Sequence, residues 1–136
     1  LTLVTPLTAG HGEIAETLLA YEQGFASSGR GRTACEAVVV VFGLAASTER
    51  EARELAGPTL VRVLRAMAGV EVEADEVLDL LRDQDLAAIG SPEQIEGFVG
   101  RLESLGVRHV AFLHGFGGLD HEHARRSIRL LAGLHA

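Results

Sequence analysis

The stretch from residue 90 to 129 restricts the fold more than any other part of the sequence. A helix is predicted to begin after Ser91, because Ser91 and Gln94 have the spacing of a capping box. Its apolar residues recur on one side, and Gly106 suits the left-handed conformation that often ends a helix. The apolar run His109–Leu113 then predicts a short strand that is covered on both faces.

A glycine-rich turn, Gly115–Gly118, follows this strand, and a last helix is predicted to begin at Asp120 or His121. The order of helix, buried strand, glycine turn and helix is typical of a parallel sheet, whose ligand-binding loops lie at the carboxyl ends of strands. Two earlier units of strand and helix share this order. Their strands are predicted at Leu1–Thr5 and Ala37–Phe42, since both runs are apolar and the second is rich in β-branched residues.

The predicted helices carry further signals. Thr48 and Glu51 form a second capping box, and Gly57–Pro58 predicts a kink or a break in the helix that follows. The acidic segment 69–88 contains a short helical pattern and is interpreted as a helical insertion. In the last helix, the apolar side is predicted to consist of Ala124, Ile128 and Leu131.

Three units of strand and helix in 136 residues predict part of a (β/α)8 barrel, since the chain has about half of the ~250 residues that such a barrel takes. An open three-stranded sheet is the alternative, and it would leave two bare edges and an apolar face for a partner to cover. No shift in composition divides residues 1–136, so they are predicted to form a single domain or one part of a larger one. Because the sequence starts inside a strand without an initiator Met, we expect it to belong to something longer.

Charge and composition exclude several classes of function. A net charge of −7 and 4% aromatic residues argue against a nucleic-acid surface or an anionic membrane as a partner. All twelve basic residues are arginine, which excludes a Schiff-base or Walker-type lysine. Cys35 is the single cysteine and cannot form an internal disulfide, so a cytoplasmic location is predicted.

Several phrases of the sequence resemble the carboxyl-terminal part of the luciferase-like flavin-dependent monooxygenases. In that family a G-[ST]-P-E-x-[VI] segment precedes the last barrel helix but one, and a phrase like FGGLPHE follows the last strand. Asp120 stands where the family usually has proline. The first residues of the chain are similar to the family's sixth barrel strand. The matching phrases are Leu1–Leu7, Ile89–Ile95, Leu102–Val110, Phe116–Glu122 and Arg126–Leu131.

The resemblance implies a (β/α)8 barrel that binds reduced FMN, or a deazaflavin in related branches, and uses dioxygen to oxidise a small organic substrate. It also implies that the histidine near the flavin and most phosphate-binding residues come from the first five strands, which this sequence lacks. We therefore expect no catalytic residue and no turnover from this chain alone. A missing N-terminal barrel half or a homo-oligomer partner would complete the site. The expected flavin-binding residues are Thr5, Leu7, His114, Gly117 and Gly118.

Other interpretations of these residues remain open. Glycines in a turn before a helix can serve backbone geometry alone, and His114 can be a loop histidine with its hydrogen bonds satisfied. His121 and His123 do not predict a metal site, because i, i+2 spacing turns two helical side chains about 200° apart. The chain could also be a non-catalytic half-barrel that binds flavin or dimerises, or an unrelated small α/β ligand-binding domain.

Overall fold

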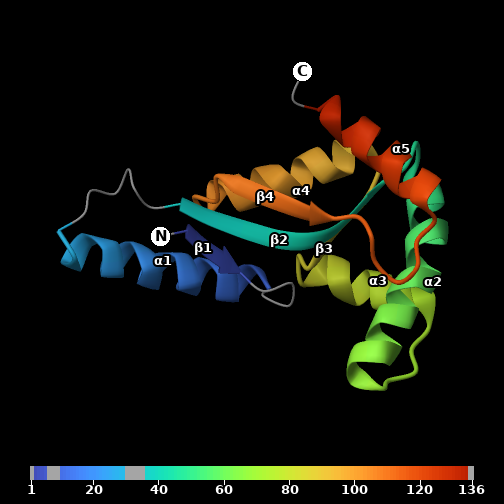
Figure 1. Cartoon of the computed structure of the whole chain (residues 1–136), viewed down its shortest axis with the longest axis horizontal. Helices are drawn as coiled ribbons and strands as arrows, with labels where there is room; N and C mark the ends of the chain where they lie inside the picture. Colours follow the sequence, from blue (N-terminus) through green and yellow to red (C-terminus); the bar gives the residue numbers. More distant parts are fainter. Residues whose placement is uncertain (1, 6–9, 30–35, 135–136) are drawn as a thin grey trace.

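Strand β2 (Glu36–Ala45) is the centre of the sheet and pairs with each of the other three strands. The computed structural model describes residues 2–5, 10–29 and 36–134, so Leu7 and Cys35 lie outside it. Figure 1 shows α1 and α4 alongside the sheet and α2 and α3 near the carboxyl end of β2. The other elements are β1 (Thr2–Thr5), α1 (His11–Ser27), α2 (Glu49–Ala68), α3 (Ala74–Asp83), β3 (Ala87–Gly90), α4 (Pro92–Ser104), β4 (His109–Leu113) and α5 (His121–Ala132).

All strand pairs in the described part of the chain are parallel, which confirms the predicted α/β class. β1 pairs with the first half of β2, where Thr5 lies opposite Val39. β4 pairs with the middle of β2, and β3 pairs with its end, where Gly90 lies opposite Ala45. The carboxyl ends of the strands therefore point in one direction, and the loops that follow them lie toward the same end of the sheet.

Strand β3 is an addition to the three strands that the sequence predicts. It consists of Ala87–Gly90, so the last two residues of the interpreted insertion, 69–88, belong to a strand. The helix expected inside that segment is present as α3 and is longer than its apolar pattern suggested. Three small residues and a single isoleucine give neither a β-branched run nor a clear alternation, which explains why no strand was predicted there.

Coverage of the sheet differs from the prediction at β4. The run His109–Leu113 was expected to be covered on both faces, but none of its five residues is fully buried. Both faces are covered in the carboxyl half of β2, where every residue from Val41 to Ala45 is buried. The only described strand that β4 pairs with is β2, so β4 lies at an edge of the sheet. One of its faces is not covered by a helix.

Two apolar cores pack on opposite faces of β2. Val39 and Val41 belong to the first core, which α1, α4 and α5 cover. Phe42 and Leu44 belong to the second core, which α2 and α3 cover beyond the middle of the strand. Each fully buried valine or leucine contributes about 1.5–3 kcal/mol relative to an exposed one, so these cores account for how the helices are docked.

The helix ends follow the sequence signals closely. The Ser91 hydroxyl accepts from the Gln94 backbone, and the Gln94 side chain accepts from the Ser91 N–H, so the predicted capping box is present. The Thr48 hydroxyl likewise accepts from the Glu51 N–H. At Gly57–Pro58, where a kink or a break was predicted, α2 continues without a break. A Cβ at residue 57 would come within 2.9 Å of the Ala74 side chain, so a glycine there permits α3 to pack closely.

Candidate functional site

One face of the sheet is apolar and carries no helix over its first half. Residues paired in register point to the same side of a parallel sheet, so Val4, Val38, Val40, Ala111 and Leu113 share this side. Val4 is 59% exposed and Leu113 is 37% exposed, whereas the other three are half-buried. We call these five residues the open face. In a closed barrel such a face points inward, where it packs against the remaining strands.

His114 follows β4 at the carboxyl end of the sheet and packs on the helix-covered side. Its Nδ1 atom lies 3.3 Å from the hydroxyl of Ser127, which is fully buried in α5. Burial lowers the pKa of His114, and a hydrogen bond to the backbone of Gly43 opposes this shift only in part. The ring is therefore neutral near pH 7 and binds α5 to the sheet. Because it points away from the open face, it does not project into the expected barrel interior.

The glycine turn packs against α2. Gly117 and Gly118 have φ values of +57° and +72°, a conformation that favours glycine. The Arg62 side chain donates from Nε to the Gly117 carbonyl at 2.5 Å, and a Cβ at residue 117 would overlap the backbone of Thr59. Backbone geometry and close packing thus account for both glycines without a ligand.

Thr5 ends β1 on the helix-covered side, in register with Val39. Only 2% of Thr5 is exposed, and its hydroxyl has no hydrogen-bond partner among the described residues. Thr5, His114 and the two glycines therefore lie in three separate environments. Of these residues, only His114 lines one of the pockets found in the described part of the chain. Leu7 lies outside the described residues.

The most consequential polar side chain of this region, Ser127, was not predicted. It accepts a hydrogen bond from the backbone N–H of Ala45 at 2.8 Å and so connects α5 to the end of β2. The buried side of α5 consists of Ala124, Ser127 and Leu131, whereas Ile128 is 50% exposed. The predicted apolar side, with Ile128 in place of Ser127, is therefore wrong by one position. The signal in the sequence was the spacing: Ser127 follows Ala124 by three residues, which places both on the same side of a helix.

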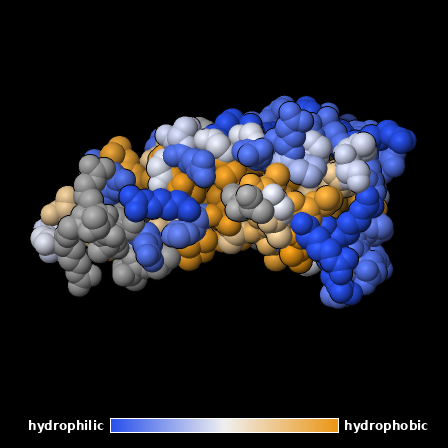
Figure 2. Space-filling model, turned by 90° about the horizontal axis from the view of Figure 1, so that it is seen from above, coloured by the Kyte–Doolittle hydropathy of each residue, from blue (hydrophilic) through white to orange (hydrophobic). Residues whose placement is uncertain are grey.

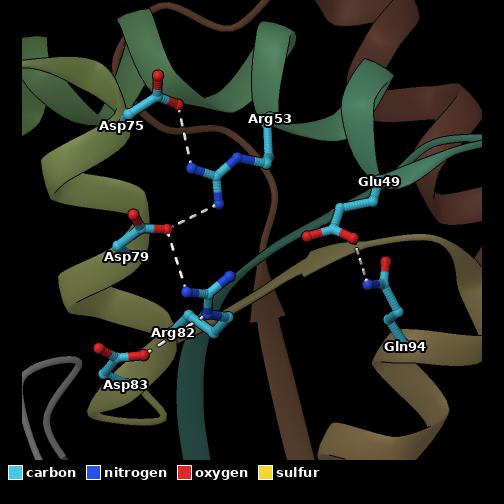
Figure 3. A network of polar contacts seen from close by, with 7 residues as sticks. All are labelled: Glu49, Arg53, Asp75, Asp79, Arg82, Asp83 and Gln94. Atoms are coloured by element: carbon cyan, nitrogen blue, oxygen red, sulfur yellow. Dashed lines mark hydrogen bonds and ion pairs between the residues drawn. The ribbon is translucent and has the colours of Figure 1, made fainter.

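Charged side chains hold the helices around the carboxyl ends of β2 and β3. Arg53 of α2 donates to Asp75 and Asp79 of α3 at 3.0 Å each, as Figure 3 shows. Burial lowers the pKa of Arg53, but the two carboxylates outweigh this effect and the net shift is upward. The Gln94 amide donates to Glu49 at 2.8 Å, which links the start of α4 to the start of α2.

The described residues form neither a cluster of metal ligands nor a helix suited to cross a membrane. No group of three or more His, Cys, Asp or Glu side chains in the described ranges is arranged to hold a metal ion. None of the helices described combines the length and the hydropathy that a bilayer crossing requires.

Comparison with known proteins rests on structure. No protein-family model matches the sequence, and a search of curated proteins found no match. Among solved structures, monooxygenase RslO1 from Streptomyces bottropensis aligns with 97% of this chain at a TM-score of 0.81 and 21% identity. The chain has the fold of part of a luciferase-like flavin monooxygenase. It spans 39% of RslO1, which agrees with a partial barrel.

Two further monooxygenase-type neighbours support the same fold. MsnO8 aligns with 89% of the chain at a TM-score of 0.66 and 18% identity, and the chain spans 40% of it. The oxygenating constituent of 3,6-diketocamphane monooxygenase from Pseudomonas putida, a type II Baeyer–Villiger monooxygenase in complex with FMN, aligns with 96% at a TM-score of 0.64 and 18% identity. The chain spans 40% of that protein as well. The predicted resemblance to luciferase-like flavin monooxygenases is thereby confirmed for the fold.

Proposed function

We propose that this chain is the carboxyl-terminal part of a flavin-dependent monooxygenase that uses reduced flavin and dioxygen to oxidise a small organic substrate. The observation that carries the proposal is the fold shared with monooxygenase RslO1 over 97% of the chain. The open face adds support, because it is apolar where a barrel would pack its remaining strands. Since the chain spans about two fifths of its neighbours, activity requires the rest of the barrel.

The described residues fit one part of a flavin site. The open face offers an apolar wall that can exclude water from a bound ring. Thr5, His114, Gly117 and Gly118 lie apart from one another, so phosphate contacts must come largely from the rest of the barrel or from a partner. Reduced flavin, once bound, supplies the dioxygen chemistry. Reduced FMN is proposed ahead of a deazaflavin, because one structural neighbour is a complex with FMN.

Flavin binding tests this function. The purified chain and a longer product that includes the residues encoded upstream of Leu1 are each titrated with FMN, and quenching of flavin fluorescence is followed. We expect tight binding by the longer product and little binding by the chain alone at concentrations on the order of tens of micromolar. Absence of binding by both proteins would refute a flavin function.

Two matched variants locate the contribution of the open face. Val4 in β1 is 59% exposed and Leu19 in α1 is 57% exposed, so a charge at either position leaves the core of the chain intact. Val4→Glu places a carboxylate in the proposed barrel interior and is expected to abolish FMN binding by the longer product. Leu19→Glu lies on a helix and should leave that binding unchanged. Equal effects of the two variants would contradict the assignment of the open face.

A second candidate is a non-catalytic half-barrel that binds flavin or dimerises. It is favoured by one observation: the described residues form two apolar cores of their own, as expected of a unit that folds without the rest of a barrel. A native start near Leu1, together with FMN binding by the chain and no oxidation in the presence of reduced FMN and dioxygen, would favour this candidate over the monooxygenase.

A further inference from the structure

A hollow of about 290 Å³ is bordered by β3 and α4. Its volume is close to the lower end of the range for small-molecule sites. Figure 2 shows apolar residues gathered along the middle of the face seen from above, with polar residues around them. The hollow differs from such a surface, because charged and amide side chains line it together with small residues. Its lining includes Glu49, Arg82, Ala88, Gln94, Gly97 and Arg101.

The hollow lies apart from the proposed flavin site. Ala88 lines it and belongs to the first core, as do Ile95 and Phe98 of α4. The hollow is therefore on the helix-covered side of the sheet, whereas the open face is on the other side. Binding in the hollow does not depend on the proposed flavin function.

One edge of β3 is available to a further strand. Among the described strands, β3 pairs with β2 alone. The Gly90 carbonyl accepts from the Ala46 N–H at 3.1 Å and so points to the β2 side. Because backbone groups alternate in direction along a strand, those of Ala87 and Ile89 point to the opposite edge. Both residues line the hollow, and their backbone groups are the donors and acceptors that an added strand would use.

Opposite charges lie at the two ends of the hollow. Arg101 donates to Asp85 at 2.8 Å, two residues before β3 begins, which places its guanidinium near the amino end of the strand. Gln94 lies beside Gly90 at the other end, since a Cβ at residue 90 would come within 2.5 Å of its Oε1 atom. The Gln94 amide donates to Glu49 at 2.8 Å, so a carboxylate lies near the carboxyl end. The two ends are about 10 Å apart, the length of a four-residue strand at ~3.3 Å per step.

We propose that the hollow binds a short peptide of about three residues, which adds to β3 as an antiparallel strand. In this orientation the terminal carboxylate of the peptide meets Arg101 and its amino group meets Glu49, whereas a parallel strand would place like charges together. An extended tripeptide is about 10 Å long, which matches the separation of the two charges. Arg82, the third charged residue of the lining, is paired with two carboxylates of its own helix. Gly97 leaves room for the peptide, because a Cβ there would meet nothing within 4 Å.

Isothermal titration calorimetry of the complete chain with trialanine tests the site. We expect a dissociation constant on the order of 0.1–1 mM. Trialanine amide lacks the carboxylate and N-acetyl-trialanine lacks the charged amino group, so each should bind about tenfold more weakly. Absence of trialanine binding at concentrations on the order of 10 mM would overturn the proposal. Equal binding of all three peptides would overturn it as well, since the two charges would then play no part.

Two glycines of α4 give a matched pair of variants. Gly97 lines the hollow and Gly100 does not, yet a Cβ at either position would meet nothing within 4 Å. Leucine favours a helix more than glycine does, so both substitutions should leave the chain folded, which circular dichroism verifies. Gly97→Leu fills the hollow and should abolish trialanine binding, whereas Gly100→Leu should bind trialanine as the wild-type chain does. Equal affinities of these two variants would place the peptide elsewhere and refute the site.

A change of charge assigns the orientation of the peptide. Arg101→Gln removes the cation that is proposed to meet the terminal carboxylate. It should weaken trialanine binding by about tenfold and leave the binding of trialanine amide unchanged, because the amide has no carboxylate to lose. An equal loss for both peptides would contradict the antiparallel orientation.

Discussion

The hydroxyl of Ser127 accepts a hydrogen bond from the backbone N–H of Ala45 at 2.8 Å, across 82 residues of sequence. Ser127 is fully buried, so Ser127→Ala would leave a donor without a partner inside the protein. We expect the free energy of unfolding to fall by about 1–3 kcal/mol, measured by urea denaturation. Ser27→Ala, at an exposed position near the end of α1, should change it by less than about 0.5 kcal/mol. Equal losses in both variants would argue against the buried hydrogen bond.

His114 should make stability depend on pH. Its pKa is lowered in the folded protein, mainly by burial, so the unfolded chain takes up the proton at higher pH. The stability that the neutral ring contributes is therefore full above the unfolded pKa of about 6.5 and is lost as pH falls through the folded pKa. Thermal unfolding should show a smaller loss on acidification for His114→Gln than for the wild-type chain. His109→Gln, at an exposed position, controls for removal of a histidine.

The two glycines after β4 should differ in their tolerance of alanine. At Gly118 the only obstacle is the left-handed backbone, which costs a residue with a Cβ roughly 1–2 kcal/mol. At Gly117 the same strain is joined by overlap with the Thr59 backbone, which cannot move as a side chain can. Gly117→Ala should therefore destabilise the fold by about 1–3 kcal/mol more than Gly118→Ala, by urea denaturation. Equal stabilities would show that the turn does not pack on α2.

Arg53 should contribute more to stability than its neighbour Arg50. The Arg53 side chain is 23% exposed and joins two carboxylates of α3, whereas Arg50 is 86% exposed and pairs with Glu54 in its own helix. Arg53→Gln is expected to lower the free energy of unfolding by about 1 kcal/mol or more, and Arg50→Gln by about 0–0.5 kcal/mol. The two losses in the free energy of unfolding are then measured at several salt concentrations. If added salt reduces both losses to the same extent, the partial burial of Arg53 is contradicted.

Local signals in the sequence predicted the helix starts and the parallel class correctly. The side-chain cap at Thr48 and the capping box at Ser91 are each formed within four residues, so they do not depend on the rest of the fold. β3 was missed because Ala87–Gly90 owes its strand conformation to pairing with β2, a contact between distant segments. Coverage of β4 was overestimated for the same reason, since an apolar run does not reveal which strand lies at an edge.

The candidate site was harder to predict than the fold. The resemblance named residues at or after the carboxyl ends of strands, but it could not reveal what each side chain contacts. Gly117 binds Arg62, 55 residues earlier, and His114 contacts Ser127 on the next helix. Such contacts depend on how helices dock on the sheet, and no local pattern encodes them. Whether Thr5, Leu7, His114, Gly117 and Gly118 bind flavin stays a prediction.

The position of β2 as the common neighbour of β1, β3 and β4 has a consequence for how the chain opens. Any one of the three outer strands can detach while the other two stay paired with β2, whereas loss of β2 separates all the strands. Amide protons from Val38 to Val41 should therefore exchange with deuterated solvent only through global opening, long after those at the outer edges have exchanged. A detached outer strand would bare a row of backbone donors and acceptors, and crowded neighbouring molecules could capture it before it returned.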